Sequence, residues 1–179
     1  MLLLSPENFK DYELIDCGNK ALSERVWLEK AHIKFIQKGS SSGTWQNIKK
    51  TNDRWKISYA LSESSSITLR LGLTSFKHVG VFPEQAVNWK YIYNSLKQIN
   101  IDKPRFLNLF AYTGAASLAA KAAGADVVHV DSIKQVVTWA NENMEHSSLS
   151  NIRWVVEDAV KFVKREVKRG NTYNGIILD

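Results

Sequence analysis

The chain has 179 residues, a length that suits one domain or one domain with a small appendage. Of these residues, 44% are hydrophobic and 23% are charged. This composition excludes an intrinsically disordered chain, and no apolar run approaches the roughly 20 residues that span a bilayer. Cys17 is the single cysteine, so an internal disulfide and a thiolate metal cluster are both excluded. The formal net charge of +6 permits a polyanionic partner without requiring one.

Residues 1–80 predict a small β-rich domain. Short apolar or alternating runs typical of strands occur at 12–15, 33–36, 44–48, 55–60 and 67–73, with one helix expected around 22–30. The opening residues 1–4 are too short for a signal peptide and have no basic start, so we expect a cytoplasmic protein without a membrane partner. The glycine and serine residues at 39–43 predict a flexible connector, and Thr51-Asn52-Asp53 predicts a hairpin turn between 44–48 and 55–60.

Residues 81–179 predict a regular alternation of strands and helices. Strands are expected at 105–110, 126–131, 152–158 and 173–179, and helices at 83–98, 113–123, 133–144 and 160–167. Such an alternation indicates βαβ units, a parallel sheet of about four strands and right-handed crossovers. The fold class is therefore predicted to be α/β, with the β-rich appendage at the N-terminus.

Polar residues stand where the predicted parallel strands end, and ligands bind outside these ends in an open sheet. Asp131, Asp158 and Asp179 end the later strands, while the first strand runs into Thr113 and Gly114. Gly114 lets the backbone approach a ligand, and the following helix offers free N–H groups and a partial positive charge. Asp is also common at strand ends and helix caps for structural reasons, but an Asp at the end of each of three successive strands favours a ligand site.

The turn after the first strand discriminates between two kinds of ribose-bearing ligand. A carboxylate such as that of Asp131 can accept hydrogen bonds from both hydroxyls of a ribose. A dinucleotide site requires G-x-G-x-x-G, whereas this turn has Gly114 alone after Tyr112 and Thr113. S-adenosylmethionine has a ribose and an adenine but no phosphate, so one glycine is enough. The turn favours this methyl donor, and a nicotinamide-dependent oxidoreductase stays as the alternative.

Five segments carry a resemblance to a known family: 80–89 (GVFPEQAVNW), 108–117 (NLFAYTGAAS), 129–131 (HVD), 156–159 (VEDA) and 176–179 (IILD). The last four resemble motifs I to IV of the class I S-adenosylmethionine-dependent methyltransferases, and are most similar to those of the large-subunit (23S) ribosomal RNA methyltransferases that modify cytosine at C5 or guanine at N2. The first resembles the segment that precedes the core of these enzymes. The match is specific from about residue 76 and looser over 1–80. The resemblance implies a Rossmann-like core over 81–179, S-adenosyl-L-methionine as cofactor, an RNA base as substrate and a part in rRNA processing.

The resemblance also implies roles for individual residues. The methionine part of the cofactor would be lined by Phe110, Tyr112, Thr113 and Gly114. The ribose and adenine would be met by Asp131, Ser132, Ile133, Asp158 and Ala159. The site would be closed from the preceding helix by Phe82, Gln85 and Trp89. Asp179 would orient the target base as the catalytic residue.

The sequence departs from the family pattern after Asp179, where the family continues with Pro-Pro and an aromatic residue that hold the target base. We therefore expect a truncated form that binds cofactor without turnover, and a fourth strand that forms an apolar sheet edge. Methylation at C5 of cytosine requires a cysteine nucleophile. Cys17 lies in the β-rich part, where a buried structural cysteine is the favoured interpretation.

Other features favour structural interpretations. The four histidines show no metal-ligand spacing, so no metal is expected, and His129 is predicted to be a core residue with its hydrogen bonds satisfied. Aromatic and basic residues at 45–56 could stack bases, which leaves a non-catalytic RNA-binding module as a third hypothesis. A half-buried strand pair with a solvated outer face is favoured there. A solvated face is also favoured for the basic residues at 161–169.

Overall fold

The computed structural model describes residues 2–3, 28–29, 31–40, 42–74 and 78–178. Cys17, Asp179, the strand expected at 12–15 and most of the helix expected at 22–30 lie outside the described residues. The chain divides into two compact units, Met1–Ile57 with Leu71–Pro83 and Ser58–Arg70 with Glu84–Asp179. Every helix among the described residues falls short of the length and apolar character that a membrane span requires.

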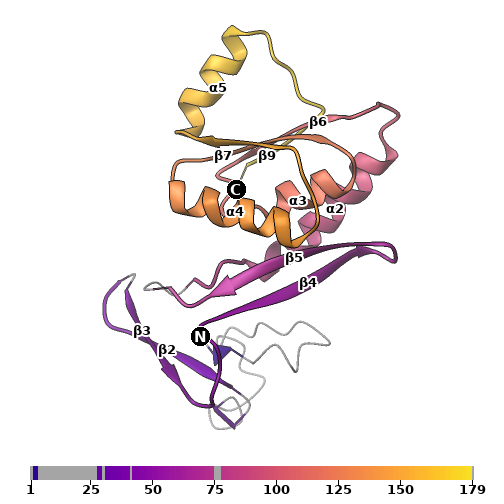
Figure 1. The fold of residues 1–179 in the computed structure, drawn as a ribbon. Helices are drawn as coiled ribbons and strands as arrows, with labels where there is room; N and C mark the ends of the chain where they lie inside the picture. The colour runs from indigo at the N-terminus through magenta and orange to yellow at the C-terminus, as the bar shows by residue number, and fades with distance from the viewer. Residues whose placement is uncertain (1, 4–27, 30, 41, 75–77, 179) are drawn as a thin grey trace. The chain divides into compact units, whose positions relative to one another are not determined.

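The first unit contains a three-stranded antiparallel sheet in the order β1-β2-β3, whose strands are Leu2–Leu3, Ile33–Gln37 and Gly43–Asn47 (Figure 1). Ile33 and Phe35 are buried from β2, as period-2 alternation in a strand requires. Within the segment predicted as a flexible connector, the described residues Gly39 and Ser42 lie between β2 and β3, and the Lys38 and Gly39 amides both donate to the Ser42 carbonyl.

The hairpin predicted around residues 51–53 is wrong. Strand β3 pairs with β2, while β4 (Arg54–Ser62) pairs with β5 (Ser65–Gly72) through the two-residue turn at 63–64. Residues 51–53 therefore connect two different sheets. Turn-forming residues mark where a strand ends but carry no information on its partner.

The second unit is built on a four-stranded sheet in which every pair is parallel. The order is β8-β7-β6-β9, with strands Arg105–Leu109 (β6), Asp126–Asp131 (β7), Ile152–Val156 (β8) and Gly175–Leu178 (β9). The chain moves outward from β6 to β8 and then returns to place β9 on the other side of β6. Ligands of open α/β sheets bind at such a reversal of strand order. The predicted α/β class and parallel sheet are confirmed.

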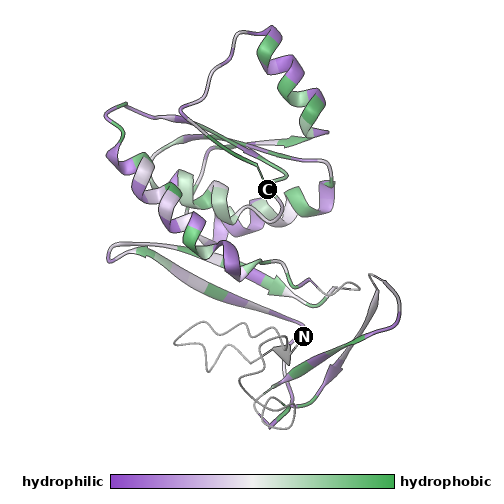
Figure 2. Ribbon diagram, turned by 180° about the vertical axis from the view of Figure 1, so that it is seen from behind, coloured by the Kyte–Doolittle hydropathy of each residue, from purple (hydrophilic) through white to green (hydrophobic). Residues whose placement is uncertain are grey.

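Four helices cover the two faces of this sheet, α2 to α4 on one face and α5 on the other (Figure 1). They are Ala86–Gln98 (α2), Ala115–Ala122 (α3), Lys134–His146 (α4) and Ala159–Lys168 (α5). A short 3-10 helix, Pro83–Gln85, precedes α2, so the helix predicted from residue 83 begins with this turn. Apolar and polar residues alternate along α5, as expected of a helix with one side on the sheet (Figure 2).

The two sheet faces have different interiors because successive side chains in a strand point to opposite sides. The face under α5 is a purely apolar cluster, made of Leu107, Leu109, Val128, Val130, Ala159 and Phe162. On the other face, Asn108 of β6 and His129 of β7 are buried together with Ser117 of α3. This second face therefore contains a polar network next to the turn that begins α3.

Candidate functional site

The turn from β6 into α3 has an unusual backbone. Phe110, Tyr112 and Gly114 have positive φ angles of 53°, 49° and 89°, in the left-handed region that non-glycine residues seldom occupy. The Phe110 side chain is 50% exposed although it follows a buried strand. Backbone strain of this kind concentrates at functional sites, where the surrounding structure holds it in place. The turn therefore has to be fixed by contacts from neighbouring elements.

Asp131 supplies several of these contacts. Its Oδ2 accepts the Tyr112 amide at 3.0 Å, its Oδ1 accepts the Ile133 amide at 2.9 Å, and its carbonyl accepts the Glu157 amide at 3.0 Å. One residue thus joins the ends of β6, β7 and β8. Each carboxylate oxygen keeps further lone pairs for a ligand hydroxyl. The sequence predicted a ligand contact at Asp131 but not its role in holding the turn.

Gly114 lies where α4 approaches the turn most closely. A Cβ placed on Gly114 would lie 3.0 Å from the Ala140 Cβ and 3.5 Å from Cε1 of His129. Glycine is therefore required both for the positive φ and for the close approach of Ala140. Thr113 beside it is buried, so the turn presents the half-buried Tyr112 and the exposed Phe110 outward.

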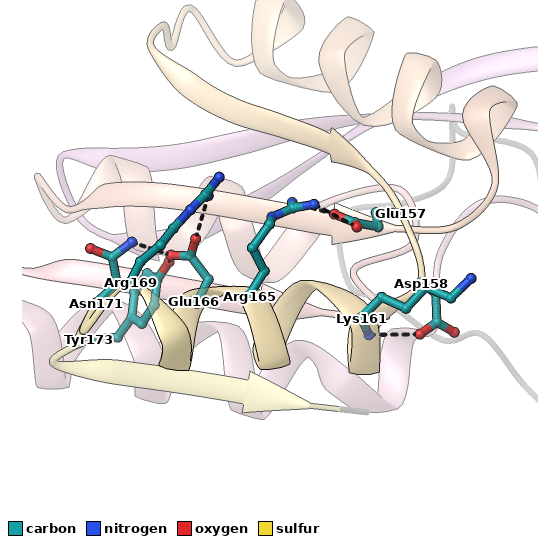
Figure 3. Close-up of polar contacts among 8 residues, drawn as sticks. All are labelled: Glu157, Asp158, Lys161, Arg165, Glu166, Arg169, Asn171 and Tyr173. Atoms are coloured by element: carbon teal, nitrogen blue, oxygen red, sulfur yellow. Dashed lines mark hydrogen bonds and ion pairs between the residues drawn. The ribbon is translucent and has the colours of Figure 1, made fainter.

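The end of β8 leads directly into α5. Asp158 is the N-cap residue, and its Oδ1 accepts the Lys161 amide at 2.9 Å (Figure 3). The Asp158 side chain is exposed, whereas that of Ala159 is buried in the core beneath α5. Asp158 thus combines a capping role with an exposed carboxylate at the strand end, and Ala159 contributes packing.

Three large apolar side chains are exposed along this edge of the sheet. Phe110, Ile133 and Val156 follow or end three adjacent strands and are 50%, 53% and 51% exposed. Clustered exposed apolar groups mark a place where an apolar partner binds. Ser132, between Asp131 and Ile133, is also exposed. Val156 was missed from sequence, although its position directly before Glu157-Asp158 was a usable signal.

Of the three residues expected to close the site, Gln85 and Trp89 belong to the second unit and Phe82 to the first. Trp89 is buried, with its ring edge-on to Tyr59 at 5.4 Å, and the Gln85 Oε1 accepts a hydrogen bond from Asn88 at 2.6 Å. Phe82 belongs to the first unit, where its ring contacts His78 at 5.2 Å. The predicted catalytic residue, Asp179, lies outside the described residues.

His129 is a core residue, and among the described residues one of its ring nitrogens has a hydrogen-bond partner. Nδ1 lies 3.0 Å from the Ser117 Oγ, which in turn accepts from the Asn108 amide at 2.9 Å. Nε2 has no hydrogen-bond partner in the part of the chain that the structure describes. Burial lowers the pKa of His129 to about 3, so the ring is neutral. The prediction of a core histidine is confirmed, and within the described residues only Nδ1 of the ring is hydrogen-bonded.

Trp45 and Arg165, from the two segments that combine aromatic or basic residues, are engaged in internal contacts. Trp45 donates its indole N–H to the Thr74 carbonyl at 2.7 Å and packs edge-on against Phe35, so it is half-buried as predicted, although its strand pairs with β2 and not with β4. Arg165 forms a two-pronged ion pair with Glu157, at 2.8 and 2.5 Å (Figure 3). Among the described residues, no group of three or more His, Cys, Asp and Glu is close enough to hold a metal ion.

Comparison with known proteins identifies relatives of this chain. A solved S-adenosylmethionine-dependent methyltransferase from Agrobacterium tumefaciens is 40% identical, with a TM-score of 0.78 over 87% of this chain and 48% of its own. A second solved methyltransferase, in complex with SAH, is 29% identical, with a TM-score of 0.54 over 63% of this chain and 30% of its own. The ribosomal RNA large subunit methyltransferase K/L of Pseudoalteromonas translucida is 32% identical over 120 residues, which are 65% of this chain and 16% of that protein.

These matches confirm the predicted resemblance and the Rossmann-like fold. The chain spans 16–19% of the length of the first curated relatives and 48% of the Agrobacterium protein. Residues 71–179, which include the four parallel strands, match the family described as Conserved hypothetical protein 95. The chain therefore belongs to the family described as Conserved hypothetical protein 95 and has the fold of the class I methyltransferases.

Proposed function

We propose that the carboxyl edge of the parallel sheet binds S-adenosyl-L-methionine, and that the chain is part of an enzyme that transfers the methyl group of this cofactor to a base in RNA. The observation that carries the proposal is the position of Asp131. Its carboxylate lies among the ends of three adjacent strands, between the glycine turn and the exposed Ile133. A carboxylate beside exposed apolar side chains suits a ligand that combines a ribose with a flat aromatic ring.

The adenosine half of the cofactor fits the β7 and β8 ends. Asp131 would accept hydrogen bonds from the ribose hydroxyls through its remaining lone pairs. Ile133 and Val156 are half exposed and would contact the adenine ring, with Ser132 at its edge. Asp158 uses one oxygen for the helix cap, and its carboxylate is exposed to accept from the adenine amino group.

The methionine half fits the turn between β6 and α3. The N-terminus of α3 carries a partial positive charge that favours a carboxylate nearby. Phe110 and Tyr112 would line this part, and Gly114 removes the side chain that would obstruct the backbone. A pyrophosphate would meet two bulky residues here instead of the glycines it requires, which argues against a nicotinamide cofactor.

Positioning accounts for much of the rate in this kind of reaction. The bound cofactor supplies a methyl group on a positively charged sulphur, which a nucleophile displaces in line. The turn and Asp131 would hold the donor in one orientation, and the exposed apolar residues would exclude water from it. Asp179 would accept hydrogen bonds from an exocyclic amine of the target base and so orient it.

An RNA substrate is supported by relatives named as ribosomal RNA methyltransferases and by the formal charge of +6. Lys161, Lys164 and Lys168 of α5 are exposed and available to phosphates. A part in rRNA processing and a cytoplasmic location belong to the same proposal.

The test is calorimetric titration of the chain with S-adenosylhomocysteine, using Asp131→Ala and Asp126→Ala as a matched pair. Asp126 begins the strand that Asp131 ends, so the control removes a carboxylate at the opposite edge of the sheet. We expect Asp131→Ala to weaken binding by roughly 1–3 kcal/mol, the scale for an unpaired polar group, and Asp126→Ala to leave it unchanged. Absence of binding by the folded chain, or tighter binding of NADH, would contradict the proposal.

A further inference from the structure

Asn143 connects the β4–β5 hairpin to the glycine turn. It lies in α4 and is fully buried, with 0% of its surface exposed. Its Nδ2 donates to the Thr113 carbonyl at 2.9 Å, and its Oδ1 accepts the Arg70 amide of β5 at 2.7 Å. One side chain therefore links two backbone segments that are 43 residues apart in sequence, as Arg70 and Thr113 are numbered.

The two backbone partners define the orientation of the Asn143 amide. An N–H can only donate and a carbonyl can only accept, so the amide must present oxygen to Arg70 and nitrogen to Thr113. An aspartate at this position would satisfy Arg70 but would place a second oxygen against the Thr113 carbonyl. Only a side chain with one donor and one acceptor in this geometry satisfies both.

Asn143 fixes one peptide unit of the turn. The carbonyl of the Thr113–Gly114 peptide accepts from Asn143, and the N–H of the same peptide donates to the Ala111 carbonyl at 3.0 Å. Both polar ends of this peptide are thus held. Asp131 holds the N–H of the Ala111–Tyr112 peptide, so the two side chains fix two separate peptide units of the turn.

At the β5 end, Arg70 and Thr68 make further hydrogen bonds to α4 and to Ser147, which follows it. The Arg70 carbonyl also accepts a hydrogen bond from the Trp139 indole N–H at 2.8 Å, and the Arg70 guanidinium pairs with Glu142 at 2.7 Å. The Ser147 Oγ accepts the Thr68 amide at 2.9 Å, and its single proton lies between the Thr68 carbonyl at 3.1 Å and the Asn143 carbonyl at 2.8 Å. Strand β5 is clamped on α4 at two residues, and among these contacts Asn143 alone continues to the turn.

We propose that Asn143 is a positioning residue that sets the affinity of the site for the amino-acid end of the cofactor, by holding the Thr113–Gly114 peptide against the hairpin. This inference rests on the proposed function. Because Asn143 acts on the turn and not on Asp131 or Ile133, its contribution falls on the methionine half of the ligand and spares the adenosine half.

Two ligands separate these halves. S-adenosylhomocysteine carries the amino-acid end, and 5′-methylthioadenosine has the same adenosine and sulphur without it. We expect Asn143→Asp to weaken binding of S-adenosylhomocysteine about tenfold and that of 5′-methylthioadenosine less than about twofold. The matched control is Ser147→Ala, which removes the hydroxyl contacts to Thr68 and to the Asn143 carbonyl but keeps both side-chain hydrogen bonds of Asn143, and should change neither affinity. Equal losses for both ligands in Asn143→Asp would indicate a merely structural role and overturn the inference.

A measurement on the wild-type chain tests the same inference if Asn143→Asp does not fold. The side-chain amide signals of Asn143 in an NMR spectrum should shift on addition of S-adenosylhomocysteine and stay in place with 5′-methylthioadenosine. Identical responses to the two ligands would contradict the inference while leaving the proposed function intact. A wild-type chain that binds neither ligand would instead contradict the proposed function itself.

Discussion

The Oγ of Ser117, in the first turn of α3, lies 3.0 Å from Nδ1 of His129 on β7. Ser117 already accepts a hydrogen bond from Asn108, so its own proton is available for Nδ1. The proton of the neutral ring then resides on Nε2, which has no hydrogen-bond partner among the described residues and lies in a ring packed edge-on against Trp154. This part of the core therefore requires an uncharged histidine.

The first prediction is a loss of stability in mild acid caused by His129. Burial lowers the pKa of His129 from 6.5 to about 3. Between pH 6.5 and pH 3, His129 is therefore protonated in the unfolded chain and neutral in the folded chain. The contribution of His129 to the free energy of unfolding should be constant above the unfolded pKa and fall as the pH decreases below it. At about pH 5 the loss should reach about 2 kcal/mol. Urea unfolding at two pH values measures it, and His129→Gln should show a smaller pH dependence by that amount. The same dependence in both proteins would refute the assignment.

The second prediction compares two glycines with positive φ. A Cβ on Gly124 meets nothing within 4 Å, so Gly124→Ala should cost only the left-handed strain, about 1–2 kcal/mol. Gly114→Ala adds a tight contact with Ala140 and should cost roughly a further 1–3 kcal/mol. Thermal unfolding gives the two values. Gly114→Ala should also weaken S-adenosylhomocysteine binding, and Gly124→Ala should not; equal effects on binding would remove the turn from the site.

The third prediction separates the two roles of Asp158. Asp158→Ala removes the cap on the Lys161 amide and should destabilise the chain by about 1 kcal/mol. Asp158→Asn keeps a capping oxygen and should be nearly as stable as the wild type. If the carboxylate also meets the adenine amino group, Asp158→Asn should still bind S-adenosylhomocysteine more weakly. Unchanged binding in Asp158→Asn would restrict this residue to capping.

The fourth prediction concerns the buried Glu166 of α5, which accepts hydrogen bonds from the Tyr173 hydroxyl at 2.6 Å, from Asn171 at 2.8 Å and from Arg169 at 3.2 Å (Figure 3). Burial by itself would raise the pKa of Glu166, but these hydrogen bonds outweigh it and hold the pKa below its ordinary value. The stability that Glu166 contributes is therefore present at neutral pH and is lost as the pH falls through that lowered pKa.

Tyr173→Phe tests this cluster. It leaves the buried carboxylate short of one donor, so we expect a loss of about 1.5–3 kcal/mol, the range for hydrogen bonds to charged groups. In a Glu166→Gln background the same substitution should cost less, because the acceptor is then neutral. A double-mutant cycle by chemical denaturation measures the difference, and additive losses would show that the two residues act independently. Because the cluster lies at the far end of α5 from Asp158, ligand affinity should not change.

Much of the second unit could be predicted from sequence because its local signals agree with each other. Apolar runs of strand length alternate with helical stripes, and Gly124 and Gly170 stand just beyond the ends of α3 and α5 with positive φ. Asp131 and Asp158 could be placed at strand ends for the same reason. Their hydrogen bonds to backbone amides depend on loop conformations that no short motif specifies.

The first sheet and Asn143 show what sequence reasoning missed. Strand β3 pairs with β2 and not with β4, which local composition does not determine. Asn143 occupies a helical position three residues after Ala140, on the apolar side of α4. A polar residue on an apolar stripe was a usable signal that it bonds buried backbone groups, but its partners on β5 and in the turn are distant in sequence.

Binding of S-adenosylmethionine at the carboxyl edge of the sheet can be mapped by following backbone amide shifts in an isotope-labelled sample during titration with the cofactor. We expect shifts at Tyr112 and Gly114, at Asp131 to Ile133 and at Val156 to Asp158, and none at the opposite edge, at Asp126, Asn171 or Tyr173. Shifts confined to that opposite edge, or a folded chain that shows no shifts, would contradict the assignment of the cofactor site to this edge.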